Sequence, residues 1–195
     1  MLTHIRPALV MIVLFTILTG LIYPLAITGI AKVALPYQAG GSLIRRTDGS
    51  IEGSAIIAQG FARPEYLHPR GSAAGNGYDA TNSSASNLGP MDKKLADRIA
   101  GDADALRKEA PGAPIPADAV TQSGSGLDPD ISPENAARQA PRIAKARGVP
   151  ATQVQAVIDR STKRPAFGFI GQPHVNVLTV NRALDVQYPL QSGRQ

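Results

Sequence analysis

The stretch PALVMIVLFTILTGLIYPLAITGIA, residues 7–31, decides the fold, because no charged side chain interrupts it between Arg6 and Lys32. An α-helix rises about 1.5 Å per residue, so roughly 20 residues cross a hydrocarbon core about 30 Å thick. The run exceeds that length. It predicts a single transmembrane helix over residues 7–32, after a short tail at 1–6 and before one soluble domain at 33–195.

Three residues inside the run, Gly20, Tyr23 and Pro24, predict a kink near Tyr23 and a seam for packing against other membrane helices. Proline removes a backbone donor and crowds the preceding turn. A bilayer tolerates this defect where neighbouring protein satisfies the freed carbonyl. Small residues such as glycine let helices approach closely.

A cleaved signal peptide is the alternative interpretation of this run. The apolar region of a signal peptide spans only about 7–15 residues, and no clean small-residue cleavage site follows the run, so the transmembrane interpretation is preferred. Basic residues lie on both sides of the run. Counting them does not choose an orientation in the membrane.

The composition excludes several classes of function. The chain contains no cysteine, which rules out disulfides, thiolate metal sites and cysteine nucleophiles. The net charge is +5, but no basic block is present, so nucleic-acid binding is not expected. The three histidines, His4, His68 and His174, stand at no spacing typical of a metal site, and we expect no metal.

Helix and strand signals are mixed in the soluble part, and they predict an α+β fold. Helices are expected over residues 91–110, 133–147 and 150–160, with Ser132 as the N-cap of the second and Gly148 at its end. Strands are expected over residues 42–47, 50–57, 117–121, 167–170 and 175–181. Residues 71–90 are expected to form an ordered loop.

The most distinctive motif of the soluble part is Ser123, Gly124, Ser125, Gly126, Leu127, Asp128 and Pro129. A glycine-rich turn before a helix can bind anions, but a phosphate loop needs a lysine, and none lies between Lys108 and Lys145. A nucleophile elbow needs a leading glycine that the motif lacks. We therefore interpret it as a structural turn in which both glycines take backbone angles closed to other residues and Leu127 points inward.

Two further sets of polar residues can each be interpreted in two ways. Asp128 and Asp130 could form an acid and base pair, but caps of the following turn and helix explain them more simply. Residues Arg63, Tyr66, His68 and Arg70 could face a partner or form an ordinary charged rim. Catalytic residues are not assigned.

Besides the apolar run, the chain contains Gly-Ser-Leu-Ile (41–44), Gln-Gly-Phe (59–61), Ser-Asn-Leu-Gly-Pro (86–90), Val-Thr (120–121) ahead of the motif at 123–129, Ile-Ser (131–132), Gln139-x-x-Arg142 and Val-Asn-Val-Leu (175–178). Together these segments resemble the KdpC family, the small subunit of the Kdp potassium-transporting ATPase. The resemblance runs nearly end to end in the same order. Gly71 and Ser84-Ala85 depart from the family's pattern.

The resemblance implies a non-catalytic accessory subunit of a pump that hydrolyses ATP to move K⁺ inward at high affinity. The implied partners are a channel-like potassium-binding subunit, a P-type ATPase subunit and membrane lipid. The chain would stabilise this complex and act as a catalytic chaperone that raises the ATP affinity of the ATPase subunit, which would hold the ATP. The family's suggested nucleotide contact matches Gln139.

The resemblance also implies a single pass through the cytoplasmic (inner) membrane, with the amino terminus in the cytoplasm and the soluble domain outside. That location conflicts with direct ATP contact by Gln139, because ATP is cytosolic. The alternative from a different class is a stand-alone, membrane-anchored enzyme or binding module outside the cytoplasm. The sequence lacks the Asp-Lys-Thr-Gly motif that accepts phosphate, so we do not expect this chain to be the catalytic subunit of a pump.

Overall fold

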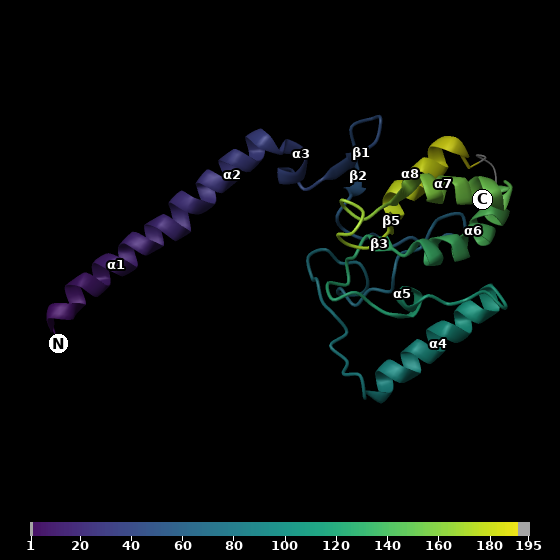
Figure 1. Ribbon diagram of the computed structural model, residues 1–195, viewed down its shortest axis with the longest axis horizontal. Helices are drawn as coiled ribbons and strands as arrows, with labels where there is room; N and C mark the ends of the chain where they lie inside the picture. The colour runs from purple at the N-terminus through teal and green to yellow at the C-terminus, as the bar shows by residue number, and fades with distance from the viewer. Residues whose placement is uncertain (1, 191–195) are drawn as a thin grey trace. The chain divides into compact units, whose positions relative to one another are not determined.

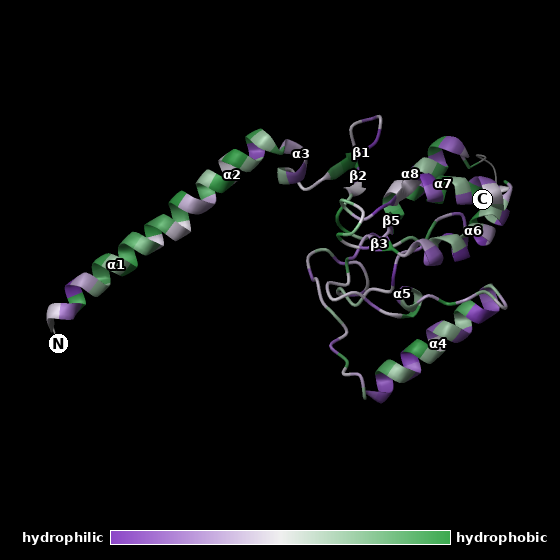
Figure 2. Ribbon diagram, viewed as in Figure 1, coloured by the Kyte–Doolittle hydropathy of each residue, from purple (hydrophilic) through white to green (hydrophobic). Residues whose placement is uncertain are grey.

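The computed structural model describes residues 2–190 (Figure 1). Its first part is a helical segment, Ile5–Ala34, made of α1 (Ile5–Ile17), η2 (Leu18–Ile22) and α2 (Tyr23–Ala34). A single turn, η1 (Leu2–His4), precedes it. Figure 2 shows that apolar residues cover most of this segment, and its side chains are exposed almost throughout. Within residues 2–190, it is the one helix long and apolar enough to cross a membrane.

The helix accommodates Pro24 by a π-turn. Proline has no N–H, and its ring crowds the carbonyl four residues earlier, here that of Gly20. In η2 the N–H of Tyr23 instead donates to the oxygen of Leu18, five residues back. The wider π-turn is a recognised way for a helix to absorb such a defect. The perturbation predicted near Tyr23 is therefore a π-turn that begins before the proline.

A short helix and a hairpin follow the long helix. The helix is α3 (Pro36–Ala39), and the strands are β1 (Leu43–Arg45) and β2 (Ile51–Ser54). The turn between the strands uses Gly49 at φ 83° and the Asp48 carboxylate, which accepts the N–H of Ser50 at 2.8 Å. The hairpin predicted around Asp48-Gly49 is confirmed.

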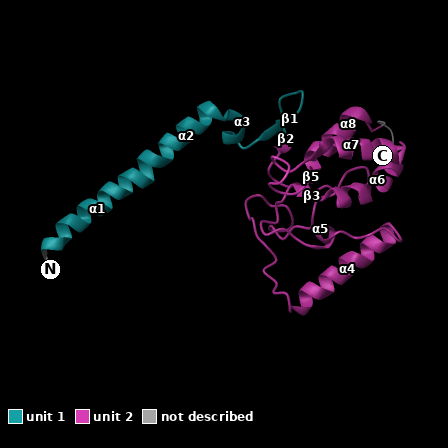
Figure 3. Ribbon diagram, viewed as in Figure 1, with its two compact units in different colours: residues 1–52 teal, residues 53–195 magenta. Residues whose placement is uncertain are grey.

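The chain divides into two compact units, Met1–Glu52 and Gly53–Gln195 (Figure 3). The second contains an antiparallel sheet in the order β3-β5-β4, where Val175 of the central strand pairs with Ile131 and Thr162. Its strands are β3 (Asp130–Ile131), β4 (Thr162–Lys163) and β5 (His174–Asn176). Its helices are α4 (Lys93–Glu109), α5 (Ala117–Val120), α6 (Pro133–Arg147), α7 (Ala151–Ser161) and α8 (Val177–Gln187).

The core of the second unit lies among α6, α7, α8 and β5, and Leu67 of the long segment before α4 is buried in it. Burial of these apolar side chains is the main force that holds the unit together. The predicted α+β class is confirmed. The buried core residues are Leu67, Ile131, Ala136, Ala140, Ile143, Ala144, Val154, Val157, Ile158, Val175, Val177, Val180 and Leu184.

Two predicted strands are wrong, and a third is predicted too long. Residues 117–120 form the short helix α5. Residues 167–170 form a tight turn closed by a bridge between Ala166 and Ile170. Only the first two residues of the predicted strand 175–181 belong to β5, because the Asn176 side chain accepts the N–H of Thr179 at 3.1 Å and starts α8. Asparagine is among the preferred N-cap residues.

Candidate functional site

The motif at 123–129 is a turn on which the long loop after β2 rests. Gly126 is buried with φ 68°, and a Cβ there would lie 2.6 Å from the oxygen of Ser84. Such a distance cannot be met without displacing the loop. The prediction of a left-handed backbone is confirmed for Gly126. It is wrong for Gly124, whose φ angle is not positive and whose Cβ position has open space around it.

Backbone atoms of the motif bind the loop directly. The oxygen of Gly126 accepts the Ser72 hydroxyl at 2.6 Å, and the oxygen of Ser125 accepts the N–H of Ser84 at 3.1 Å. The Leu127 side chain is only half-buried, but its carbonyl accepts the N–H of Ala58 at 2.9 Å. On the side of the motif, these contacts are made by backbone carbonyl groups, and the hydroxyls of Ser123 and Ser125 take no part in them. The motif therefore positions the loop.

The aspartates around the motif are engaged as caps and ion pairs. Asp128 accepts the N–H of Asp130 at 3.1 Å and pairs with Arg70 at 3.0 Å. Asp118 accepts the Ser132 N–H and hydroxyl, both at 2.8 Å, at the start of α6. The sequence interpretation missed Asp118, because it placed this residue in a strand. An aspartate fourteen residues before a capped helix gives no local signal of this contact.

The side chain of Gln139, on α6, is buried and bound to the backbone of His68. Its Oε1 accepts the His68 N–H at 2.8 Å, and its Nε2 donates to the His68 oxygen at 3.1 Å. Oε1 also accepts from Arg142 at 2.7 Å, and Nε2 lies 3.3 Å from the Asn135 Oδ1. The amide is therefore fully occupied by contacts within the domain.

Asn181, on α8, holds the preceding residue in the same way. Its Oδ1 accepts the Leu67 N–H at 2.7 Å, and its Nδ2 donates to the Leu67 oxygen at 2.9 Å. The side chain is almost fully buried. Two amide side chains thus pair with both peptide groups of consecutive residues in an irregular segment.

Two arginines of α6 hold the same segment. Arg142 donates to the oxygens of Pro64 at 2.7 Å and Tyr66 at 3.0 Å. Arg147 donates to the Glu65 oxygen at 2.8 Å and lies over the Tyr66 ring, 5.2 Å from its centroid. We call Gln139, Arg142, Arg147 and Asn181 the clamp, and residues 64–68 the clamped segment. The sequence singled out only the first two of these.

His68 carries the clearest electrostatic signal of the clamped segment. Burial lowers the pKa of its imidazole below the usual range, and the positive charge of Arg142 lowers it further, against the carbonyl of Arg63 and the charge of Glu109. Its Nε2 lies 3.0 Å from the Arg63 oxygen and 3.3 Å from Arg142 Nη1. The ring is therefore neutral at neutral pH, and its protonation would place a second cation beside Arg142.

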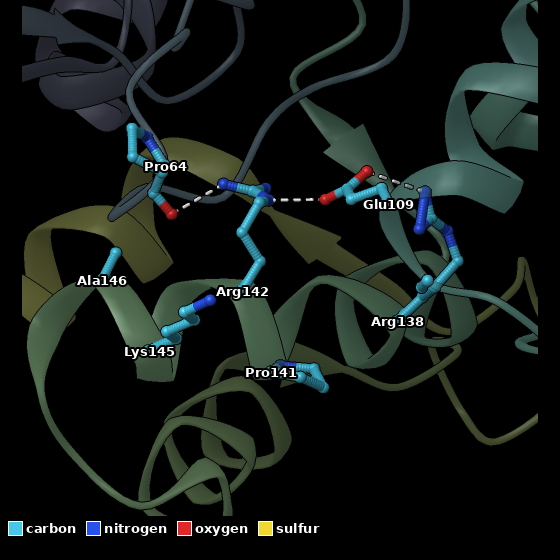
Figure 4. Close-up of a pocket in the computed structure, with 8 residues that line it drawn as sticks. Pro64, Glu109, Arg138, Pro141, Arg142, Lys145 and Ala146 are labelled. Carbon is cyan, nitrogen blue, oxygen red and sulfur yellow. Dashed lines mark hydrogen bonds and ion pairs between the residues drawn. The ribbon is translucent and has the colours of Figure 1, made fainter.

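An open cleft of about 600 Å³ lies beside the clamp. Figure 4 shows Glu109, from the end of α4, between two arginines of α6: Arg142 Nε lies 2.7 Å from it and Arg138 Nη2 lies 3.3 Å from it. Within residues 2–190, the Nε and Nη1 of Arg138 have no hydrogen-bond partner. The cleft is lined by Pro64, Glu109, Ala110, Arg138, Pro141, Arg142, Lys145 and Ala146.

The arrangement provides positioning and charge pairing. The cleft residues with ionisable side chains are three cations and the carboxylate that pairs with two of them, without a nucleophile activated by a base. The part of the chain that the structure describes contains no group of three His, Asp or Glu side chains suited to a metal ion. Gly20, Tyr23 and Pro24 lie apart from these residues in the sequence, and their side-chain positions are exposed.

Comparison with known proteins identifies close relatives. Residues 5–186 match the family model described as "KdpC: K+-transporting ATPase, c chain". A protein of Caulobacter sp. (strain K31) named "Potassium-transporting ATPase KdpC subunit" is 64% identical over 189 residues, which cover 97% of this chain and 96% of that protein. Proteins with the same name from Beijerinckia indica subsp. indica and Rhodospirillum rubrum are 55% and 50% identical, each over at least 97% of both chains.

Proposed function

The chain belongs to the KdpC family of potassium-transporting ATPase subunits, and from that premise we propose that it is an accessory, non-catalytic subunit. It stabilises the complex and raises the affinity of the P-type ATPase subunit for ATP. Its partners are that subunit and a channel-like potassium-binding subunit. The observation that carries the proposal is the end-to-end match, which covers both the apolar helix and the soluble domain.

The proposed location is the cytoplasmic membrane, with a span over residues 7–32, a cytoplasmic tail at 1–6 and an extracytoplasmic domain at 33–195. The single long apolar helix of the described residues supports the single pass. ATP would then be out of direct reach of the domain. Its effect on nucleotide affinity would pass through the membrane helices as a coupling free energy, typically about 1–3 kcal/mol.

Within this proposal, Gln139 acts as a positioning residue and does not contact nucleotide. Its amide already pairs with both backbone groups of His68. A nucleotide could bind this amide only by breaking those bonds and leaving half-buried peptide groups without their side-chain partner, which costs about 1–3 kcal/mol for each group. The internal pairing therefore supports an indirect role.

The affinity part of the proposal is tested by measuring the binding of a non-hydrolysable ATP analogue to the purified complex with and without this chain. A coupling of about 1–3 kcal/mol corresponds to a 5–150-fold change in affinity, so the dissociation constant should rise at least several-fold when the chain is omitted. An unchanged constant would remove the chaperone role and leave only stabilisation of the complex.

The location is tested with a single cysteine, because the chain has none of its own. Ala100→Cys places a thiol at an exposed position of α4. A membrane-impermeant thiol reagent should label it in intact spheroplasts. Labelling only after lysis would place the domain in the cytoplasm, and direct nucleotide contact would then become the better explanation of any ATP effect.

A further inference from the structure

A cluster of large apolar side chains is exposed on the turn between β4 and β5. Phe167, Phe169 and Ile170 are 88%, 78% and 55% exposed, and we call them the apolar tip. Single exposed apolar residues are ordinary on a protein surface. Three within four consecutive residues expose apolar surface in one place, and contiguous exposed apolar surface marks sites of interaction with proteins or membranes.

The turn that presents the apolar tip is held in one shape by its own backbone. Ala166 and Ile170 exchange two hydrogen bonds of 2.9 Å, and Gly168 donates to the Pro165 oxygen at 3.1 Å. Phe167 has φ 54°, a left-handed conformation that costs a residue with a Cβ about 1–2 kcal/mol. The chain therefore keeps its two phenyl rings on a closed, ordered turn.

Positive charge adjoins the apolar tip. Lys163 and Arg164 directly precede the turn, and both are exposed. The sequence contains no acidic residue between Asp159 and Asp185. An apolar, aromatic tip beside basic side chains matches the two layers of a membrane surface, where rings sit at the interface and cations meet anionic headgroups.

We propose that the apolar tip inserts into the interface of the bilayer to which the chain is anchored, with Lys163 and Arg164 against anionic lipid phosphates. The apolar helix Ile5–Ala34 favours this occupant over a soluble protein. Anchoring makes the encounter with lipid intramolecular, so even weak insertion is favoured by a high effective concentration. The tip is then a second, reversible membrane contact of the soluble domain.

The chain contains no tryptophan, so Phe169→Trp creates a single fluorescent reporter on the tip. The full chain is reconstituted into vesicles of phosphatidylcholine and phosphatidylglycerol in equal parts, with or without bromine on the acyl chains. Bromine quenches tryptophan only within the bilayer. The tip reporter should emit at shorter wavelength and lose most of its intensity in brominated vesicles.

Two controls make this result specific. Val186→Trp, at an equally exposed position of α8 (81% exposed), should stay unquenched and emit as in water. Adding Lys163→Glu and Arg164→Glu to the Phe169→Trp chain should reduce quenching at least several-fold. Because both tryptophans replace exposed side chains, matching circular dichroism spectra confirm that each variant is folded.

Water-like, unquenched emission from the tip reporter would overturn the proposal. So would emission that becomes shielded only in the assembled ATPase complex without bromine quenching, because a protein partner would then cover the tip. The vesicle measurement needs neither ATP nor another subunit. Its failure would therefore leave the proposed role in the ATPase complex standing.

Discussion

Single side chains of the clamp make the backbone hydrogen bonds that a neighbouring strand makes in a sheet. Asn181 and Gln139 each accept one backbone N–H and donate to one backbone oxygen of the clamped segment. Buried peptide groups need such partners, and an irregular segment has none of its own. Side-chain pairing therefore lets Leu67 enter the core without a strand.

Replacing Gln139 by alanine should lower the free energy of unfolding by about 1–3 kcal/mol, because the half-buried N–H and carbonyl of His68 lose their side-chain partners. Equilibrium urea unfolding of the full chain in detergent, followed by circular dichroism, measures this. Gln155→Ala is the matched control, since Gln155 donates to Asp159 one turn later on the same helix, α7, in an exposed hydrogen bond of 2.7 Å. Equal effects of the two substitutions would contradict the clamp.

Gly126→Ala should destabilise the domain by about 1–2 kcal/mol through its left-handed backbone alone, and further through the approach of the new Cβ to the Ser84 oxygen. Gly124→Ala is the control in the same motif, with open space at its Cβ position, and it should change stability little. Thermal unfolding distinguishes the two. A larger loss of stability in Gly124→Ala than in Gly126→Ala would show that the left-handed, tightly packed position of the motif is not Gly126.

The lowered pKa of His68 predicts a pH dependence of stability. The folded-state pKa lies below the unfolded value of about 6.5, so the unfolded chain binds more protons as the pH falls below that value. The free energy of unfolding should therefore decrease as the pH falls below about 6.5 and towards the folded-state pKa. In a plot of the urea midpoint of unfolding against pH, His68→Gln should reduce the slope below about pH 6.5. An unchanged slope would show that other groups cause this pH dependence.

At the scale of secondary structure, capped helices were predictable and context-dependent elements were not. Ser132 and Gly148 bound α6 as the sequence predicted, because capping is a local property. Residues 175–181 are rich in β-branched side chains, a strand signal that tertiary packing overrides. The spacing of Val177, Val180, Asn181 and Leu184, all buried in α8, was the helical signal that could have corrected it.

The site shows the same division between local and distant signals. The motif predicted a left-handed backbone at two glycines, which is right for Gly126 and wrong for Gly124, because glycine permits this conformation locally without requiring it. Gln139 and Arg142 stood out only through the family resemblance. Asn181 and Arg147 could not be found at all, since their partners lie 114 and 82 residues away in the chain. Contacts over such separations depend on the fold.

The long apolar helix Ile5–Ala34 yields a prediction about assembly. If Gly20 belongs to a packing seam with Tyr23 and Pro24, Gly20→Leu should weaken association with the other subunits without preventing insertion, because a bulky side chain keeps helices apart. The measurement is the amount of partner recovered with the chain after detergent extraction. Gly29→Leu, at the other glycine of the helix, is the control. Full recovery with Gly20→Leu would remove the seam.

At the scale of the whole molecule, an apolar helix and a clamped α+β domain make a chain suited to assembly. The helix exposes its apolar side chains to its surroundings. In the second unit, the polar clamp residues contact backbone and neighbouring side chains. These features suit the anchored accessory subunit that we propose, and the proteins with which the chain associates decide whether the proposal holds.

Isolation of the chain from native membranes in mild detergent tests that claim most directly. We expect it to co-purify with much larger membrane proteins, one of them phosphorylated by ATP on an aspartate, and we expect the isolated fraction to hydrolyse ATP in a potassium-dependent manner. The purified chain alone should hydrolyse none. A solitary chain with hydrolytic or ligand-binding activity of its own would contradict the account and favour a stand-alone anchored enzyme or binding module.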